Sequence, residues 1–178
     1  QIMASSTAPG GSLINFRRNY SGNWGVSFGT ANTGIDTNSV NMHWMPPVRS
    51  GGSYFYTAHL FSIYRYVSAS WVKLNASLFP YTVSNFDVSS NGNIIYAALN
   101  SQIPGSKFRV YDGGAWYERS NGIASNVSIR NVTVHPSNEN IAYIVARENN
   151  IGGQKVYMTN NKGVLWNNIS GNLPNSIP

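Results

Sequence analysis

Short apolar stretches alternate with polar turns along the whole chain. Within residues 81–125, each stretch has four to six residues and is rich in β-branched and aromatic side chains: Asn85–Val88, Ile94–Leu99, Lys107–Tyr111 and Ala115–Glu118. Clusters of Gly, Pro, Asn and Ser separate them, which is typical of β-strands joined by tight turns. The pattern therefore predicts a four-stranded antiparallel meander.

The same order of strands recurs at an interval marked by tryptophan. The spacings are 47, 45 and 50 residues between Trp24, Trp71, Trp116 and Trp166. Four-stranded repeats of about 40–50 residues are typical of the blades of a β-propeller. We therefore expect one partial, all-β propeller domain over residues 1–178, with blades at approximately 1–35, 36–80, 81–125 and 126–178.

The remaining copies are less regular than the third. In the fourth blade we expect strands at Asn131–Val134, Ile141–Val145, Gln154–Tyr157 and Leu165–Trp166. In the second, we expect an inner strand at Asn41–Trp44, followed by Ser53–Ala58, Phe61–Tyr66 and Trp71–Leu74. The first blade lacks an inner strand and has its others at Gln1–Ser5, Leu13–Arg17 and Trp24. The array thus has about three and a half to four blades, and its open edges predict contact with further blades or with a second copy.

Composition narrows the range of functions. The chain has no cysteine, so it offers neither disulfides nor thiolate metal ligands, and we expect a secreted or cell-surface protein of bacterial type. No stretch reaches the roughly 18–20 apolar residues of a membrane span. The net charge is +6, but the basic residues are scattered, with one adjacent pair at Arg17-Arg18. Nucleic-acid binding is not predicted, because it needs a concentrated basic face.

One segment carries a family resemblance. Residues 159–166 read Thr-Asn-Asn-Lys-Gly-Val-Leu-Trp. This run resembles the Asp-box of bacterial neuraminidase repeat (BNR) and sortilin-like propellers, Ser/Thr-x-Asp-x-Gly-x-Thr-Trp, with Asn161 in place of Asp and Leu165 in place of Thr. The resemblance implies a β-propeller in which the box has a structural role, carried by Thr159, Asn161, Gly163 and Trp166. We expect all four repeat tryptophans, including Trp24, to be core anchors that pack between blades.

The resemblance also implies two enzyme classes, sialidases and propeller-type xyloglucanases. Glycoside hydrolysis uses two carboxyl groups flanking the bond that is cleaved. Asp36 and Asp87 are the two acidic residues that could meet across a groove, although each also fits a structural role. The sialidase residues are not carried over, because Asn15–Asn19 lacks the Ile-Pro of the family motif. The histidines, His43, His59 and His135, lack metal-ligand spacing, so no metal or cofactor is expected.

Two functional hypotheses remain. The favoured one is a non-catalytic extracellular module for binding, adhesion or assembly, with a glycan or protein as ligand. Propellers present their loops on one face, where Tyr, Trp, Asn and Arg side chains suit such contacts. The alternative is a fragment of a polysaccharide-degrading glycoside hydrolase of the sialidase or xyloglucanase kind.

Overall fold

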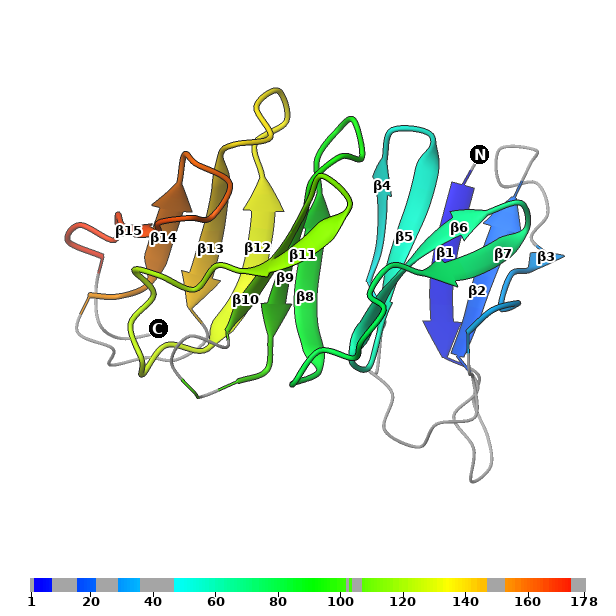
Figure 1. The fold of residues 1–178 in the computed structure, drawn as a ribbon, viewed down its shortest axis with the longest axis horizontal. Coiled ribbons are helices and arrows are strands. Elements are labelled where there is room, and N and C mark those ends of the chain that lie inside the picture. The colour runs from blue at the N-terminus through cyan, green and yellow to red at the C-terminus, as the bar shows by residue number, and fades with distance from the viewer. Residues whose placement is uncertain are drawn as a thin grey trace.

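The computed structural model describes residues 2–7, 16–21, 29–35, 47–101, 103, 107–146 and 153–173. These residues form strands and turns, with no helix among them. The strands make one three-stranded and three four-stranded antiparallel sheets, which lie side by side in chain order (Figure 1). The predicted all-β, propeller-like array of four-stranded blades is confirmed.

Each sheet is a meander in which consecutive strands are neighbours. The first contains β1 (Ile2–Thr7), β2 (Phe16–Ser21) and β3 (Gly29–Thr30). The second, blade 2, contains β4 (Val48–Gly51), β5 (Tyr54–His59), β6 (Ser62–Val67) and β7 (Ser70–Lys73). Blade 3 contains β8 (Val83–Val88), β9 (Ile95–Leu99), β10 (Phe108–Asp112) and β11 (Ala115–Glu118). Blade 4 contains β12 (Ile129–Val134), β13 (Ala142–Ala146), β14 (Val156–Thr159) and β15 (Asn167–Asn168).

The inner strand of blade 2 lies later than the sequence predicts. The prediction of Asn41–Trp44 is wrong for this strand, because β4 at Val48–Gly51 is the strand that pairs with β5. Two prolines, Pro46 and Pro47, come directly before it. Proline cannot donate to a strand ladder, so the ladder begins after the pair, and a Gly51-Gly52 turn closes the hairpin. Residues 41–46 lie outside the described residues.

In the first sheet, the last described strand is β3, and the fourth strand predicted at Trp24 lies outside the described residues.

The hydrophobic cores lie between adjacent blades. Between blades 2 and 3, the side chains of Tyr56, Ala58 and Ile63 pack with those of Val83, Phe86 and Val88. Between blades 3 and 4, the core is made by Tyr96, Ala98, Phe108, Val110, Val132, Ile144, Tyr157 and Trp166. Blade 3 therefore packs through both faces of its sheet, as expected for stacked repeats that cannot bury a core alone.

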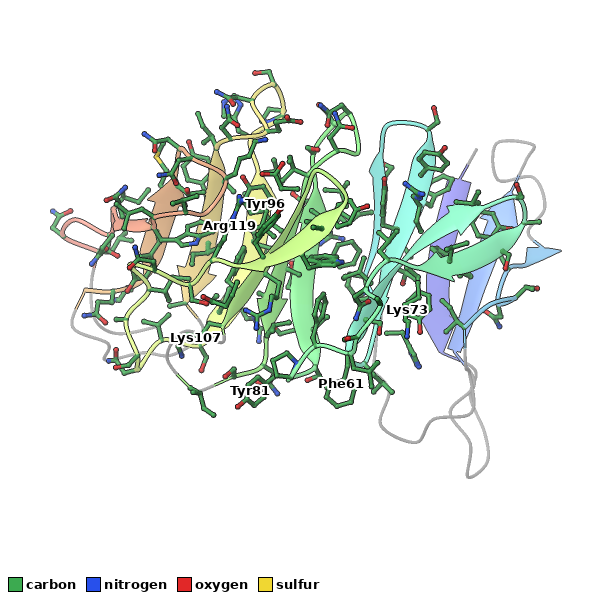
Figure 2. All side chains as sticks on the ribbon, viewed as in Figure 1. Phe61, Lys73, Tyr81, Tyr96, Lys107 and Arg119 are labelled. Carbon is green, nitrogen blue, oxygen red and sulfur yellow. The ribbon has the colours of Figure 1, made fainter. Side chains whose placement is uncertain are left out.

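Polar contacts join the same blades at the hairpin between first and second strands. The Tyr56 hydroxyl donates to the Gly92 carbonyl of the next blade at 3.2 Å. One blade further on, the Tyr96 hydroxyl donates to the Glu139 carbonyl at 2.8 Å. At the other end of blade 3, the buried ammonium of Lys107 donates to the carbonyls of Ser101 and Val127 (Figure 2).

Candidate functional site

A small polar residue four positions after each of the described tryptophans, Trp71, Trp116 and Trp166, holds the outer edge of its blade. The residues are Asn75, Ser120 and Ser170, each no more than 4 % exposed. The Ser120 hydroxyl accepts from the amides of Lys107 and Phe108 at 3.1 and 3.0 Å. Ser170 accepts from Lys155 and Val156 in the same way, and Asn75 Oδ1 accepts from Ile63. These side chains satisfy amides that would otherwise be buried without partners.

The residue directly after the last strand of a blade accepts a hydrogen bond from the tryptophan of the following blade. Trp71 Nε1 donates to the Ala31 carbonyl at 2.6 Å, and Trp166 Nε1 donates to the Arg119 carbonyl at 2.9 Å. The backbone amide of each of these two tryptophans donates to the carbonyl two residues after the indole acceptor. Trp71 N donates to Thr33 O, and Trp166 N donates to Asn121 O. Each tryptophan is 2 % exposed, so each contributes both apolar burial and hydrogen bonds to its blade junction.

Residues 159–166, the segment that resembles an Asp-box, form a closed hydrogen-bonded turn. Thr159 Oγ1 donates to Asn161 Oδ1 at 2.9 Å and accepts from the Gly163 amide at 2.9 Å. Asn161 Oδ1 accepts from the Leu165 amide at 3.0 Å. Gly163 adopts a φ of 81°, which favours glycine. Asn161 thus makes the acceptor contacts that an aspartate would make, and the turn delivers Trp166 to its site.

The junction between blades 2 and 3 is built differently, and it leaves a pocket. Trp116 Nε1 donates to the Leu74 carbonyl at 3.3 Å, but Trp116 remains partly exposed. The chain after Asn75 does not form the turn that follows Ser120 and Ser170, in which the amide three residues on donates to the serine carbonyl. The Asn75 side-chain amide instead donates to the carbonyls of Phe61 and Ser77, at 3.0 and 2.8 Å.

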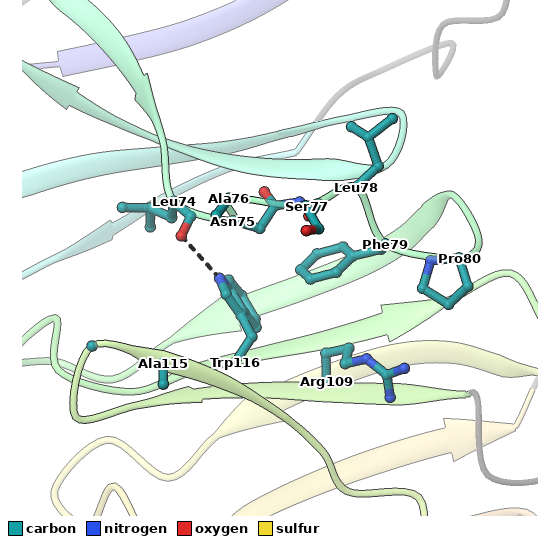
Figure 3. Close-up of a pocket in the computed structure, with 11 residues that line it drawn as sticks. Leu74, Asn75, Ala76, Ser77, Leu78, Phe79, Pro80, Arg109, Ala115 and Trp116 are labelled. Carbon is teal, nitrogen blue, oxygen red and sulfur yellow. Dashed lines mark hydrogen bonds between the residues drawn. The ribbon is translucent and has the colours of Figure 1, made fainter.

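The resulting pocket has a volume of about 390 Å³. Segment 74–80 forms one wall, and the β10–β11 hairpin forms the other (Figure 3). Trp116 and Phe79 meet edge to face at its base, with ring centroids 4.8 Å apart, and the Arg109 side chain lies beside them. The volume falls in the range of pockets that bind small ligands, about 300–1,000 Å³. Aromatic rings with a guanidinium beside them offer an apolar platform with hydrogen-bond donors at its edge.

The charge of this pocket is balanced by one acidic residue. Arg109 forms an ion pair with Glu118 on the neighbouring strand, with Nη1 and Oε1 3.5 Å apart. Burial lowers the pKa of the Arg109 guanidinium, and the Glu118 carboxylate acts in the opposite direction. Arginine stays charged in proteins because its ordinary pKa lies far above neutral pH. The pocket is therefore lined by the positively charged Arg109 guanidinium, which is already paired with the Glu118 carboxylate.

Of the two candidate catalytic aspartates, the structure describes Asp87. It lies on the inner strand β8, where Arg49 Nε is 3.4 Å from Asp87 Oδ1. Asp87 Oδ2 accepts from the Val134 amide of the next blade at 2.8 Å. Asp87 therefore links three inner strands. Asp36 lies outside the described residues, so the pairing of the two carboxylates remains a prediction.

A second pocket, which is lined mainly by polar residues, lies where blades 2, 3 and 4 approach one another. Its volume is about 420 Å³, and its charged lining residues are Arg65, Asp112, Glu139 and Lys162. Asp112 forms ion pairs with Lys162 at 3.1 Å and with Arg119 at 3.2 Å. Figure 2 shows Arg119 near Tyr96 at this junction. Burial of Asp112 raises its pKa, but the bonds from Lys162 and Arg119 outweigh it and leave the pKa lowered.

This lowered pKa predicts a pH-dependent contribution to stability. An aspartate in the unfolded chain has a pKa of about 3.9. The Asp112 contribution is complete above that pH and is lost as the pH falls through the lower folded-state pKa. We expect Asp112→Asn to be less stable than the wild type by about 1 kcal/mol near pH 7, and the deficit to shrink as the pH falls below about 3.9. Urea unfolding measured over this range of pH gives the difference, and a deficit that does not change with pH would contradict the assignment.

Two features of the site were not part of the sequence prediction. The first is the polar residue at Asn75, Ser120 and Ser170, which a search for Trp-x-x-x-Asn/Ser would have found. The second is the pocket beside Trp116, which carries no sequence signal because it arises from the path of segment 74–80. Within the described residues, no three His, Cys, Asp or Glu side chains gather as metal ligands.

Comparison with solved structures identifies similar folds. The chain superposes on an ancestral GH74 enzyme with a TM-score of 0.61 at 19 % identity, covering 97 % of this chain and 24 % of that one. It also superposes on the GH74 xyloglucanase from Xanthomonas campestris with a TM-score of 0.55 at 13 % identity, covering 88 % and 22 % of the two chains. The chain thus spans about a quarter of the length of these structures.

Sequence comparisons add no assignment. No protein-family model matches the chain, and no curated protein matches it. The BNR resemblance therefore rests on residues 159–166, while the propeller fold is supported by structure. Within the described residues, no helix is long and apolar enough to span a membrane.

Proposed function

We propose that the chain binds a polysaccharide at the Trp116 pocket, as part of a polysaccharide-degrading propeller similar to the xyloglucanases. This follows the alternative hypothesis drawn from the sequence more closely than the favoured one. The observation that carries it is the pocket itself, where Trp116, Phe79 and Arg109 line a hollow of suitable size. Two of the solved structures with a similar fold are GH74 enzymes, and one of these is a xyloglucanase.

The pocket has the chemistry that a sugar ring requires. A pyranose presents C–H groups on its faces and hydroxyl groups at its rim, so it suits an aromatic surface edged by polar groups. Trp116 is held in place by its indole bond to Leu74 and by contact with Tyr111, at a centroid distance of 5.3 Å. A fixed aromatic ring loses little conformational freedom on binding.

The interactions of the described carboxylates support a role in binding, more than in hydrolysis, for this part of the chain. Asp87, Asp112 and Glu118 each form ion pairs with arginine or lysine. Glu139 accepts a hydrogen bond from Asn91 at 2.6 Å. A hydrolase needs one protonated and one free carboxyl group flanking the same bond. We propose that the catalytic pair involves residues beyond those described, with Asp36 as a candidate.

Binding is tested with xyloglucan oligosaccharides and this chain. We expect the quenching of tryptophan fluorescence to saturate on titration, and Trp116→Ala to weaken affinity at least about tenfold, as loss of a central aromatic contact does. Isothermal titration calorimetry gives the affinity independently of fluorescence.

The matched control is Trp71→Phe, which alters a buried tryptophan away from the pocket and keeps most of its apolar volume. Its affinity should equal that of the wild type. Equal affinity of Trp116→Ala and wild type, with the variant folded by circular dichroism, would refute the pocket as the binding site. A preference for sialylated glycans over xyloglucan oligosaccharides would refute the proposed class of polysaccharide.

We further propose that the protein is secreted or displayed at a bacterial cell surface, where its substrate would be found. Secreted eukaryotic domains of this size often carry disulfides, so the absence of cysteine favours a bacterial over a eukaryotic source for such a protein. Detection of the protein in the culture medium or in the cell-surface fraction is the expected result, and its confinement to the cytoplasmic fraction would contradict it.

A further inference from the structure

The outward face of blade 4 is an exposed apolar surface. We define it by six residues on β13, on β14 and after β15: Tyr143, Val145, Val156, Met158, Ile169 and Leu173. Three of them are strongly exposed, with Val145 at 43 %, Ile169 at 47 % and Leu173 at 48 %. None of the six carries a charge. The opposite face of the same strands packs against blade 3 through Ile144 and Tyr157.

The same positions in the other blades are buried by the next blade. Strand pairing places Tyr143 opposite Thr133, as Tyr96 lies opposite Asp87. Val145, two residues after Tyr143, therefore corresponds to Ala98, which is fully buried between blades 3 and 4. Ala58, the corresponding residue of blade 2, is fully buried as well. The outward face of blade 4 is thus the counterpart of two surfaces that each hold a blade.

The carbonyl that receives tryptophan is also repeated on this face. At three junctions an indole N–H donates to the residue after the outer strand: Ala31, Leu74 or Arg119. Ile169 is that residue in blade 4, because it directly follows β15 and precedes Ser170. Its amide bonds to the Val156 carbonyl, as the Arg119 amide bonds to Phe108. The described tryptophans, Trp71, Trp116 and Trp166, all lie at other junctions.

The turn after Ile169 differs from its counterpart in one respect. Leu173 N bonds to Ser170 O at 3.2 Å, as Ile123 N bonds to Ser120 O at 3.1 Å. In the turn Ser170–Leu173, the residue with a positive φ is Gly171, the first of the two central residues. In the turn Ser120–Ile123 it is Gly122, the second central residue. The central peptide is therefore oriented differently. An incoming tryptophan would keep its indole bond, as Trp116 does, without the additional backbone bond of Trp166.

We propose that the outward face of blade 4 docks a further four-stranded blade of the same repeat. That blade carries a tryptophan at its outer strand, whose indole N–H donates to the Ile169 carbonyl. Its first hairpin supplies a backbone carbonyl to the Tyr143 hydroxyl, as Glu139 does for Tyr96. The partner is identified by continuity with the two blade junctions already present, and the inference does not depend on polysaccharide binding.

The test uses a chain extended by a fifth blade, made by adding a second copy of residues 126–173 after residue 178. The natural chain has no cysteine, so a single Val145→Cys thiol reports on this face alone. We expect this thiol to react rapidly in the unextended chain and at least about 100-fold more slowly in the extended one, because reaction then requires the blades to separate. Val72→Cys, on an outer strand and 47 % exposed, should react equally fast in both.

A second variant tests the tryptophan. Trp166→Phe in the added copy alone removes the indole donor, and we expect about tenfold faster labelling at Val145→Cys than in the parent extended chain. Unchanged reactivity of Val145→Cys on extension would overturn the proposal. An added blade that stays unfolded by circular dichroism would also overturn it, since a single meander needs a docking face to fold.

A second copy of the chain is the rival occupant. Protection of Val145→Cys in the unextended chain that increases with protein concentration, together with a doubled mass by light scattering, would assign the face to a dimer and overturn the proposal. A monomeric mass with a fully reactive thiol supports docking of a further blade.

Discussion

Trp166→Ala is expected to lower the free energy of unfolding by about 3–5 kcal/mol. The indole is 2 % exposed and meets the Phe108 ring edge to face at a centroid distance of 4.9 Å. Its N–H satisfies the Arg119 carbonyl. Truncation would leave a cavity between blades 3 and 4 and a carbonyl without its donor, and these two losses add. Urea unfolding followed by circular dichroism measures the change.

Trp116→Ala is the matched comparison, because it removes the same side chain from a junction where the indole is partly exposed. We expect a loss of about 1–2 kcal/mol, since less apolar area is withdrawn from water at this site. The ratio between the two variants reports how much of the tryptophan contribution comes from complete enclosure. Equal losses would show that the Trp116 pocket is as tightly packed as the Trp166 junction.

The blades themselves could be predicted from the sequence because their determinants are local. Each strand of blade 3 combines a run of β-branched and aromatic residues with a turn on either side, and β8–β11 begin within two residues of the predicted positions. The tryptophan spacing then indicated stacking. The box at Thr159, Asn161 and Gly163 is also local, since its bonds join residues no more than four apart.

The inner strand of blade 2 could not be placed in the same way. Asn41–Trp44 and Val48–Gly51 both offer short runs compatible with a strand. The choice depends on which of them pairs with β5, and that pairing is a tertiary property. The two prolines before Val48 are the local clue, because they prevent pairing through their own amides.

The candidate site was the least predictable part. Asn75 and Ser120 occupy equivalent positions, yet the longer Asn75 side chain also reaches the carbonyls of Phe61 and Ser77. Segment 74–80, which contains Asn75, forms one wall of the pocket beside Trp116. Its bond to Phe61 depends on a carbonyl that folding brings near, so no sequence pattern encodes it. The pairing of Asp87 with Arg49 likewise joins two different blades.

Gly122→Ala is expected to lower the free energy of unfolding by about 3–5 kcal/mol, although it adds a single methyl group. Gly122 has a φ of 87°, and a Cβ built there would lie 2.0 Å from the backbone oxygen of Trp166. Backbone cannot rotate away as a side chain does, so the two blades would have to separate. This separation would also weaken both hydrogen bonds of Trp166, so the loss in free energy of unfolding would exceed that from the steric clash alone.

Gly114→Ala distinguishes this contact from the strain of an unusual backbone. Gly114 has nearly the same φ, 90°, but its added Cβ would meet nothing within 4 Å. It should therefore lose about 1–2 kcal/mol, the cost of the conformation alone. The excess loss at Gly122 measures how closely blade 4 approaches blade 3. If both variants lose the same amount in urea unfolding, the blades tolerate a wider separation, and the tryptophan bonds are not what fixes their distance.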